Sequence, residues 1–319
     1  MFADTHRRIR TELWASLGIL AVVSLLPVVM TNDYWRGVII VSMYFAMLAI
    51  GWNLVAGYTG QFALAPATFG MIGAYTTGLL AYHFGATALS GIPAAIIATG
   101  IVGFGLARIV MRLRGPYLAL TTLSFAEIMR LVISNSIGIT RGDLGLNVPS
   151  LFENRLVYYY VMLAVLTAVQ LGIYLLLRSS AGLYLRAIRD DEIAAAGRGV
   201  NIVRWKTFAF TLSAAIGGLA GALYGHFAQL ISPDLGLISQ TGLIISMVVI
   251  CGLGALVGPI SGALLVYVTS EELREFGGYQ LIVFALLVIL FARFFREGIW
   301  GLLRVGYERL MTPSVTAAE

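Results

Sequence analysis

Ten apolar runs, separated by short polar segments, constrain this chain more than any other feature of its sequence. They lie at residues 13–30, 37–56, 62–82, 91–111, 116–139, 156–177, 207–230, 242–253, 259–269 and 279–295. A membrane-spanning helix needs roughly 20 mainly apolar residues. Only 12% of the 319 residues are charged, about half of the roughly 25% that is usual in soluble chains. We therefore predict an all-α, polytopic transmembrane helical bundle formed by one domain, residues 1–319.

The eighth and ninth runs are short, and a segment rich in glycine separates them at residues 252–259. Glycine and proline interrupt helices, and irregular backbone at membrane depth is tolerated only inside protein or along a wet cavity. The two runs form either two spans or one broken, re-entrant unit. The expected number of spans is therefore about ten, within a range of eight to ten.

The basic residues fix an expected orientation, because cytoplasmic loops carry an excess of Lys and Arg. With a cytoplasmic start, four basic residues fall outside: Arg36, Arg141, Arg155 and Arg274. Sixteen fall inside: Arg7, Arg8, Arg10, Arg108, Arg112, Arg114, Arg178, Arg186, Arg189, Arg198, Arg204, Lys206, Arg293, Arg296, Arg304 and Arg309. Both termini are predicted to be cytoplasmic, with a cytoplasmic loop at 178–206 and a tail at 297–319.

Several classes of chemistry are unexpected here. A P-loop needs a Gly-Lys-[Ser/Thr] triplet, and the chain's one lysine, Lys206, follows a tryptophan. The single Cys251 excludes a cysteine metal cluster or disulfide framework. His6, His83 and His226 are far apart in sequence, which disfavours a zinc site. We expect no enzyme, no bound cofactor and no metal, with His226 bonding between helices and Cys251 acting as a small buried hydrophobe.

The cytoplasmic loop contains the most structured polar stretch. Leu185, Ile188, Glu192 and Ala196 recur at helical spacing, and alanine-rich sequence favours helix. Charges of both signs surround this pattern, whereas a helix on a lipid surface would be more uniformly basic. The loop is therefore predicted to dock into another protein; the alternative is a solvated loop that only obeys the positive-inside rule.

Five sequence motifs are distributed over about 210 residues of the chain. The loop carries RAIRDDEIAA at 186–195 and GVN at 199–201. The other motifs are GYTGQFAL at 57–64 with GAY at 73–75, RGPYLALTTL at 114–123 with Glu127 and Arg130, SAA at 213–215 with GALY at 221–224 and ISP at 231–233, and GLG at 252–254 with GP at 258–259.

By these motifs and their order the chain resembles the M-type permease subunits of branched-chain amino acid ABC importers. The resemblance implies a permease driven by separate subunits. The expected partners are a homologous second permease, one or two cytoplasmic ABC ATPase subunits that hold ATP and Mg, and an extracytoplasmic solute-binding protein. The expected location is the bacterial cytoplasmic (inner) membrane. The loop would then couple to the ATPase through Arg186, Arg189, Asp190, Asp191, Glu192 and Gly199.

Two segments depart from the family pattern, at residues 65–69 (APATF) and 140–146 (TRGDLGL). They leave the fold inference intact and leave the solute open. Branched-chain or related amino acids are expected, with urea or short amides as the alternative. A stand-alone secondary transporter is the competing class, although no ladder of intramembrane acids suggests ion coupling.

Glycine-containing breaks at residues 57–60, followed by Gln61, and at residues 252–259 mark a candidate translocation path. Paired breaks in the two halves of a transporter point to its binding site. The candidate residues are Asn53, Tyr58, Gly60, Gln61, Thr68, Gly252, Gly254 and Pro259. The alternative explanation is close helix packing by small residues.

Glu127 and Arg130 lie in an apolar run at i,i+3 spacing, where they can neutralise each other. We expect an intramembrane ion pair near the inner end of its helix. It serves either structure alone, or a gate or a contact with the partner subunit.

Overall fold

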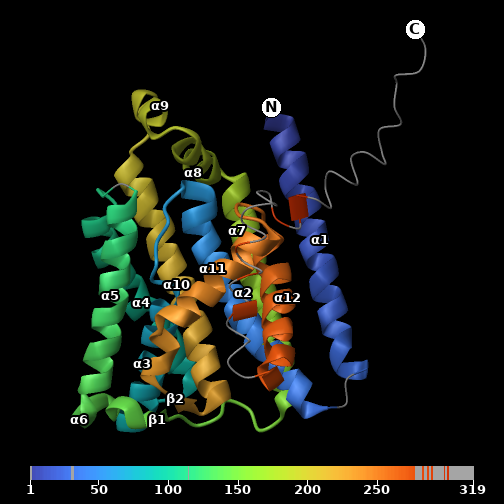
Figure 1. Cartoon of the computed structure of the whole chain (residues 1–319), viewed down its shortest axis with the longest axis vertical. Helices are drawn as coiled ribbons and strands as arrows, with labels where there is room; N and C mark the ends of the chain where they lie inside the picture. The colour runs from blue at the N-terminus through green and yellow to red at the C-terminus, as the bar shows by residue number, and fades with distance from the viewer. Residues whose placement is uncertain are drawn as a thin grey trace.

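The computed structural model describes residues 2–29, 32–113 and 115–276, together with positions 282, 283, 286, 289, 298, 300 and 301. Over this part of the chain it is an all-α bundle, which confirms the predicted fold class (Figure 1). The only strands in the described ranges are β1 (Leu146–Asn147) and β2 (Leu230–Ile231), an antiparallel pair that sets Leu146 opposite Ile231.

Long helices build the body of the molecule. They are α1 (Phe2–Val29), α2 (Asp33–Thr59), α3 (Pro66–Phe84), α4 (Ala88–Val110), α5 (Pro116–Asn135), α7 (Arg155–Arg178) and α10 (Ile202–Ala228). The shorter helices are α6 (Ile137–Thr140), α8 (Ser180–Asp190), α9 (Glu192–Gly197), α11 (Ile238–Cys251) and α12 (Gly258–Glu272), with 3-10 turns η1 (Gly142–Leu144), η2 (Pro233–Gly236) and η3 (Leu273–Phe276).

Nine of the ten predicted runs overlap a helix, and the tenth, 279–295, lies largely outside the described residues. In the described part of the chain, six helical segments are long and apolar enough to cross a membrane, and they fall in α1, α2, α4, α5, α7 and α10. Helices α11 and α12 have 14 and 15 residues, a length of about 21–23 Å against a hydrocarbon core of about 30 Å. A multi-pass membrane protein follows, with six full-length spans among the residues that the structure describes.

Two of the predicted runs include a helix break that hydropathy does not locate. The run expected from residue 62 becomes helical only at Pro66, because Gly60 takes a left-handed φ of 72° and ends α2. The run expected to reach residue 139 breaks at Ser136, which separates α5 from α6. In both cases the apolar composition continues through the break, so hydropathy alone does not locate it.

Helix α2 forms the centre of the bundle, and nearly all of its residues from Val38 onward are buried. Helices α3 and α10 approach each other through glycines. A Cβ on Gly221 would lie 1.8 Å from Gly70 O, and one on Gly73 would lie 2.3 Å from Gly218 O. Such close backbone contact is the usual function of small residues in membrane helices.

The two ends of the bundle differ in character (Figure 1). Helices α8 and α9, from the segment predicted to be cytoplasmic, gather at one end. Helix α6 and the β1–β2 pair lie at the other. The loop at 178–206, predicted to be inside, and the segment around α6 and β1, predicted to be outside, therefore lie at opposite ends of the molecule.

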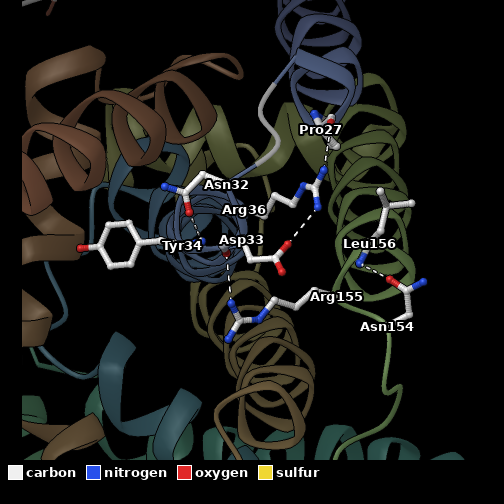
Figure 2. Close-up of polar contacts among 8 residues, drawn as sticks. All are labelled: Pro27, Asn32, Asp33, Tyr34, Arg36, Asn154, Arg155 and Leu156. Carbon is white, nitrogen blue, oxygen red and sulfur yellow. Dashed lines mark hydrogen bonds and ion pairs between the residues drawn. The ribbon is translucent and has the colours of Figure 1, made fainter.

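Polar contacts tie α1, α2 and α7 together at the α6 end (Figure 2). Arg36 donates from Nη1 to Asp33 Oδ1 at 2.9 Å and from Nη2 to Pro27 O at 3.1 Å. Arg155 donates from Nη1 to Asp33 O at 3.1 Å. Asn32 and Asn154 cap the starts of α2 and α7 by accepting from Tyr34 N and Leu156 N, each at 2.9 Å. These side chains hold the three helix ends in a fixed arrangement.

Candidate functional site

Helices α8 and α9 form the end of the molecule that the sequence assigns to coupling. Leu185 and Ile188 are buried beneath α8, whereas Arg189, Asp190 and Asp191 are exposed. Asp191 also begins α9, because its Oδ1 accepts from Ile193 N at 2.8 Å and Ala194 N at 3.0 Å. The result is an exposed rim of both charges beside Ile193, an apolar side chain that is 76% exposed.

Arg186, the first predicted coupling residue, turns back onto the bundle. It donates from Nε to Gly182 O at 3.1 Å and from Nη2 to Leu177 O at 2.9 Å, so it caps the end of α7. Burial lowers the pKa of Arg186, although a guanidinium stays charged at any physiological pH. Gly199, the last predicted coupling residue, is exposed and has a left-handed φ of 84°, so it provides the predicted turn.

Glu192 also faces inward. Its Oε1 accepts from Gln61 Nε2 at 3.1 Å and forms an ion pair with Lys206 Nζ. The lysine side chain is only 2% exposed and that of Glu192 is 26% exposed. One carboxylate in α9 therefore connects the end of α2 with the start of α10.

The first helix break is an irregular segment, residues 60–65, between α2 and α3. Trp52 Nε1 donates to Ala63 O at 2.7 Å, and Leu64 N donates to Thr122 Oγ1 at 2.8 Å. Pro66 then begins α3 at a position where its missing N–H costs nothing. Side chains of α2 and α5 thus satisfy backbone groups that the broken helix leaves free.

The second break, residues 252–257, is held by three helices. Gly254 N donates to Asn53 Oδ1 at 2.8 Å, and Ala255 O accepts from Asn53 Nδ2 at 2.9 Å. Leu256 is held at both backbone groups: its O accepts from Gln170 Nε2 and its N donates to Glu12 Oε2, each at 2.8 Å.

Sequence reasoning missed Glu12 and Gln170. Glu12 is 3% exposed and Gln170 is fully buried. Glu12 lies one residue before the first apolar run. At such a position an acidic residue is expected to belong to the polar segment that precedes the helix. Gln170 is the one polar amide inside the sixth run, and that is the signal by which it could have been found.

Arg189 brings the two breaks and the coupling loop together. A Cβ on Gly254 would lie 2.4 Å from Arg189 Nη1, and one on Gly60 would lie 3.8 Å from Arg189 Cα. A cavity of about 500 Å³ opens beside this junction, lined by Gly60, Gln61, Phe62, Gly115, Pro116, Leu118, Ala119, Asp191, Glu192 and Ile193.

The other candidate path residues lie inside the protein. Asn53, Tyr58 and Thr68 are each less than 5% exposed, and both polar groups of Asn53 are used by residues 254–255. Gly252 has a φ of 135°, Gly254 has a φ of 77°, and Pro259 stands in the first turn of α12. These residues shape the breaks, and their contact with a solute stays a prediction.

Glu127 and Arg130 form the expected ion pair in α5, with Arg130 Nε donating to both carboxylate oxygens at 3.1 Å. The pair lies past the middle of the Pro116–Asn135 helix, so the expected position near the inner end is wrong. The sequence estimate counted from Arg114 and extended the helix to residue 139, beyond its actual end.

His226 and Cys251 follow their expected structural roles. His226 hydrogen-bonds to Thr77 Oγ1 of α3 at 2.9 Å and to Pro149 O at 2.8 Å, and Cys251 is buried. Within the described ranges, no three His, Cys, Asp or Glu side chains lie close enough to hold a metal ion.

A family model described as "Branched-chain amino acid transport system / permease component" matches residues 35–292. The high-affinity branched-chain amino acid transport system permease protein LivM of Escherichia coli K12 is 31% identical over 279 residues, which cover 78% of this chain and 66% of the relative. LivH of the same strain is 25% identical over 288 residues, covering 81% of this chain and 93% of the relative.

Similarity extends to BraD, the corresponding permease protein of Pseudomonas aeruginosa, which is 25% identical over 275 residues, or 78% of this chain and 89% of the relative. The match with LivM of Salmonella typhimurium also covers 66% of that relative, so the chain spans just under two thirds of the LivM proteins. No solved structure matches the chain.

Proposed function

Because the chain belongs to the branched-chain amino acid transport system permease family, we propose that it is the permease subunit of an ABC importer for branched-chain or related amino acids. Separate ATPase subunits, which hold the ATP and Mg, drive it, and an extracytoplasmic binding protein delivers the solute. The observation that carries this proposal is the contact of Arg189 with both helix breaks at the exposed α8–α9 end.

A second permease of the same fold completes the pore. Support comes from the similarity of this chain to both LivM and LivH, two permease proteins of one bacterial strain. A heterodimer of two related chains would place equivalent helices of each chain across a shared pseudo-two-fold axis. We therefore favour a sister chain over a second copy of this one.

The α8–α9 end lies in the cytoplasm, where it docks into a groove on the ATPase subunits. Arg189, Asp190 and Asp191 supply the exposed contacts, while Arg186 and Glu192 hold the loop to the bundle. When the ATPase dimer closes, movement of α9 reaches Gln61 through Glu192, and movement of α8 reaches Gly254 through Arg189. Small shifts at a packed junction of this kind can switch helices between discrete arrangements.

The chain lies in the bacterial cytoplasmic membrane with both termini inside and with eight to ten crossings. Helix α3, the two short helices α11 and α12, and the apolar run at residues 279–295 supply the crossings beyond the six full-length spans. The path residues Gly60, Gln61, Gly252 and Gly254 then act as pivots between the coupling loop and the bundle interior.

Reconstitution in proteoliposomes with the ATPases, the second permease and the binding protein tests the proposal. The wild-type complex is expected to accumulate leucine with ATP inside, and the R189A/D190A chain is expected to assemble normally but lose solute-stimulated hydrolysis. Exposed Glu153 on the opposite end, changed to Gln, is the control. Unchanged hydrolysis and uptake by R189A/D190A would contradict the assignment of the coupling residues. Uptake of urea in place of leucine would instead contradict the proposed solute.

A further inference from the structure

Helices α4 and α10 are in close contact near Gly103 and leave a cavity at one end. A Cβ on Gly103 would lie 2.3 Å from the Cβ of Ala214. Beyond this contact, toward the end of α4 and the start of α10, a cavity of about 800 Å³ opens between the two helices. Helix α10 begins directly after α9, so the cavity belongs to the α8–α9 end of the bundle (Figure 1). Its volume lies within the range of about 300–1,000 Å³ that is usual for ligand sites.

The lining of this cavity is strongly basic. The residues that form it, which we name the α4–α10 cavity, are Phe104, Arg108, Arg112, Asn201, Val203, Arg204, Thr207, Phe208 and Thr211. Three of these nine residues are arginines, and none of the nine is acidic. Each arginine is exposed, and no ion pair within the described part of the chain neutralises any of the three. The cavity therefore has a positive charge that this chain does not compensate.

Two threonine hydroxyls in the same cavity lack hydrogen-bond partners. Thr207 is 6% exposed, and neither its Oγ1 nor that of Thr211 has a partner among the described residues. A threonine inside a helix can donate to the carbonyl of residue i−4, as Thr99 does to Ala95 O at 2.6 Å. A buried hydroxyl without a partner is unfavourable. A hydrogen-bond acceptor inside the cavity would satisfy both threonines.

Membrane orientation and helix dipoles explain only part of this arrangement. The positive-inside rule places basic residues on the cytoplasmic side, but it does not require them to share a cavity. Arg108 lies in the last turn of α4, where the helix dipole favours a cation, whereas Arg204 lies in the first turn of α10, where the dipole favours an anion. Arginine binds the oxygens of phosphate through paired N–H donors. Three arginines and two free hydroxyls thus match a phosphate group.

The cavity is continuous with an apolar face of α4. Ile97, Ile101 and Phe104 are exposed, and with Arg108 they recur at helical spacing, so the four side chains share one side of the helix. The guanidinium carbon of Arg108 lies 5.6 Å from the centroid of the Phe104 ring. An acyl chain along this apolar face would bring its phosphate to the arginines. A water-soluble phosphate compound would make no use of the apolar side chains.

We propose that the α4–α10 cavity binds the phosphate of an anionic phospholipid from the cytoplasmic leaflet. This inference rests on the proposed function for its orientation, which places the α8–α9 end in the cytoplasm. Basic pockets between membrane helices on the cytoplasmic side bind anionic lipid headgroups through the same chemistry. The three arginines pair with the phosphate, Thr207 donates to it, and Phe104 and Phe208 flank the acyl chains. The bound lipid fastens the start of α10, which directly follows the coupling loop, to the end of α4.

Native mass spectrometry of the complete transporter, titrated with phosphatidylglycerol against a background of phosphatidylcholine, tests the proposal. We expect R108Q/R204Q to weaken the binding of phosphatidylglycerol about thirtyfold, or roughly fivefold for each charge. T207V exchanges a hydroxyl for a methyl group without changing the charge, and it should weaken binding about tenfold. If the cavity is empty in the membrane, T207V should instead leave lipid binding unchanged, which would overturn the proposal.

Two matched controls lie outside the cavity. R10Q/R178Q removes two exposed charges, on α1 and α7, that are predicted to lie on the same side of the membrane. T167V removes a hydroxyl of α7 that donates to Leu163 O at 2.7 Å. Neither control should change the affinity for phosphatidylglycerol. An equal loss in R10Q/R178Q and R108Q/R204Q would overturn the site, because it would indicate a general attraction of anionic lipid to basic residues.

Two further outcomes would also overturn the lipid site. Displacement of phosphatidylglycerol by inorganic phosphate at equal concentration would show that a free anion is sufficient. Loss of the ATPase subunits from the R108Q/R204Q complex, with unchanged lipid affinity, would assign the arginines to a protein contact. The proposed function is tested separately: failure of the wild-type complex to import leucine under ATP would contradict it and leave the lipid-binding measurements unaffected.

Discussion

The side-chain amide of Asn53 hydrogen-bonds in both directions to the break between α11 and α12: its oxygen accepts from Gly254 N at 2.8 Å, and its nitrogen donates to Ala255 O at 2.9 Å. Asn53 lies two turns inside the central helix and is 3% exposed. A residue that sequence alone assigns to solute contact therefore holds irregular backbone in place. Its function is to make a helix break stable at membrane depth.

Replacing Asn53 with Ala is expected to destabilise the purified complex. The change leaves the Gly254 N–H and the Ala255 carbonyl without partners, and each unsatisfied buried group costs about 1–3 kcal/mol. Thermal unfolding in detergent should show a lower Tm, accompanied by loss of uptake. N135A is the matched control, because Asn135 is exposed and bonds only to Leu131 O within its own helix. A Tm for N53A equal to that of N135A would contradict the bridging function.

Gly221 should tolerate no larger residue, because a Cβ there would lie 1.8 Å from the Gly70 carbonyl oxygen. The carbonyl oxygen belongs to the backbone of α3 and the Cβ is fixed to the backbone of α10, so the two helices would have to separate. We expect G221A to decrease the Tm and the yield of folded chain. Gly105, inside α4 with nothing within 4 Å of its Cβ position, provides the control. G105A should be neutral or should stabilise by up to about 1 kcal/mol, and the same loss in both variants would argue against glycine-mediated packing.

Glu192 is expected to be a coupling residue that acts through Gln61 and Lys206. E192Q keeps an acceptor for Gln61 but removes the charge paired with a lysine that is 2% exposed, and leaving a buried charge unpaired is unfavourable. Uptake should fall by at least tenfold while basal ATP hydrolysis persists. Hydrolysis and uptake that decrease together, with less assembled complex, would indicate a folding defect instead.

The E192Q/K206M chain separates coupling from folding. Removing both charges is often neutral for stability, because neither partner is then buried alone. The double variant should therefore recover the Tm and the assembly of the wild-type chain. It should not recover uptake, since the connection from α9 to α10 is gone. Recovery of full uptake would show that the ion pair contributes stability only.

Hydropathy and the positions of glycine residues predicted much of this fold. Membrane helices need long apolar runs, and the breaks between them need residues with a flexible backbone. Sequence also located the residues that meet at the junction, among them Gln61, Arg189 and Gly254. It could not give the direction of their side chains. Glu192 and Arg189 are three residues apart in one polar loop, yet only Glu192 turns toward Lys206. Such directions depend on tertiary contacts that no local pattern encodes.

The α5 ion pair gives opposite expectations for a lipid-facing and a path-facing helix. If Glu127 and Arg130 faced lipid, replacing both with Leu would remove an energetic cost of roughly 2.5–3.5 kcal/mol for each charge and leave uptake unchanged. If they line the path, the E127L/R130L chain should fold with a Tm within a few degrees of wild type and lose at least tenfold in uptake rate. The control is I97L/I101L on the apolar face of α4, where both interpretations expect normal uptake. Normal uptake by E127L/R130L would show that the ion pair faces lipid.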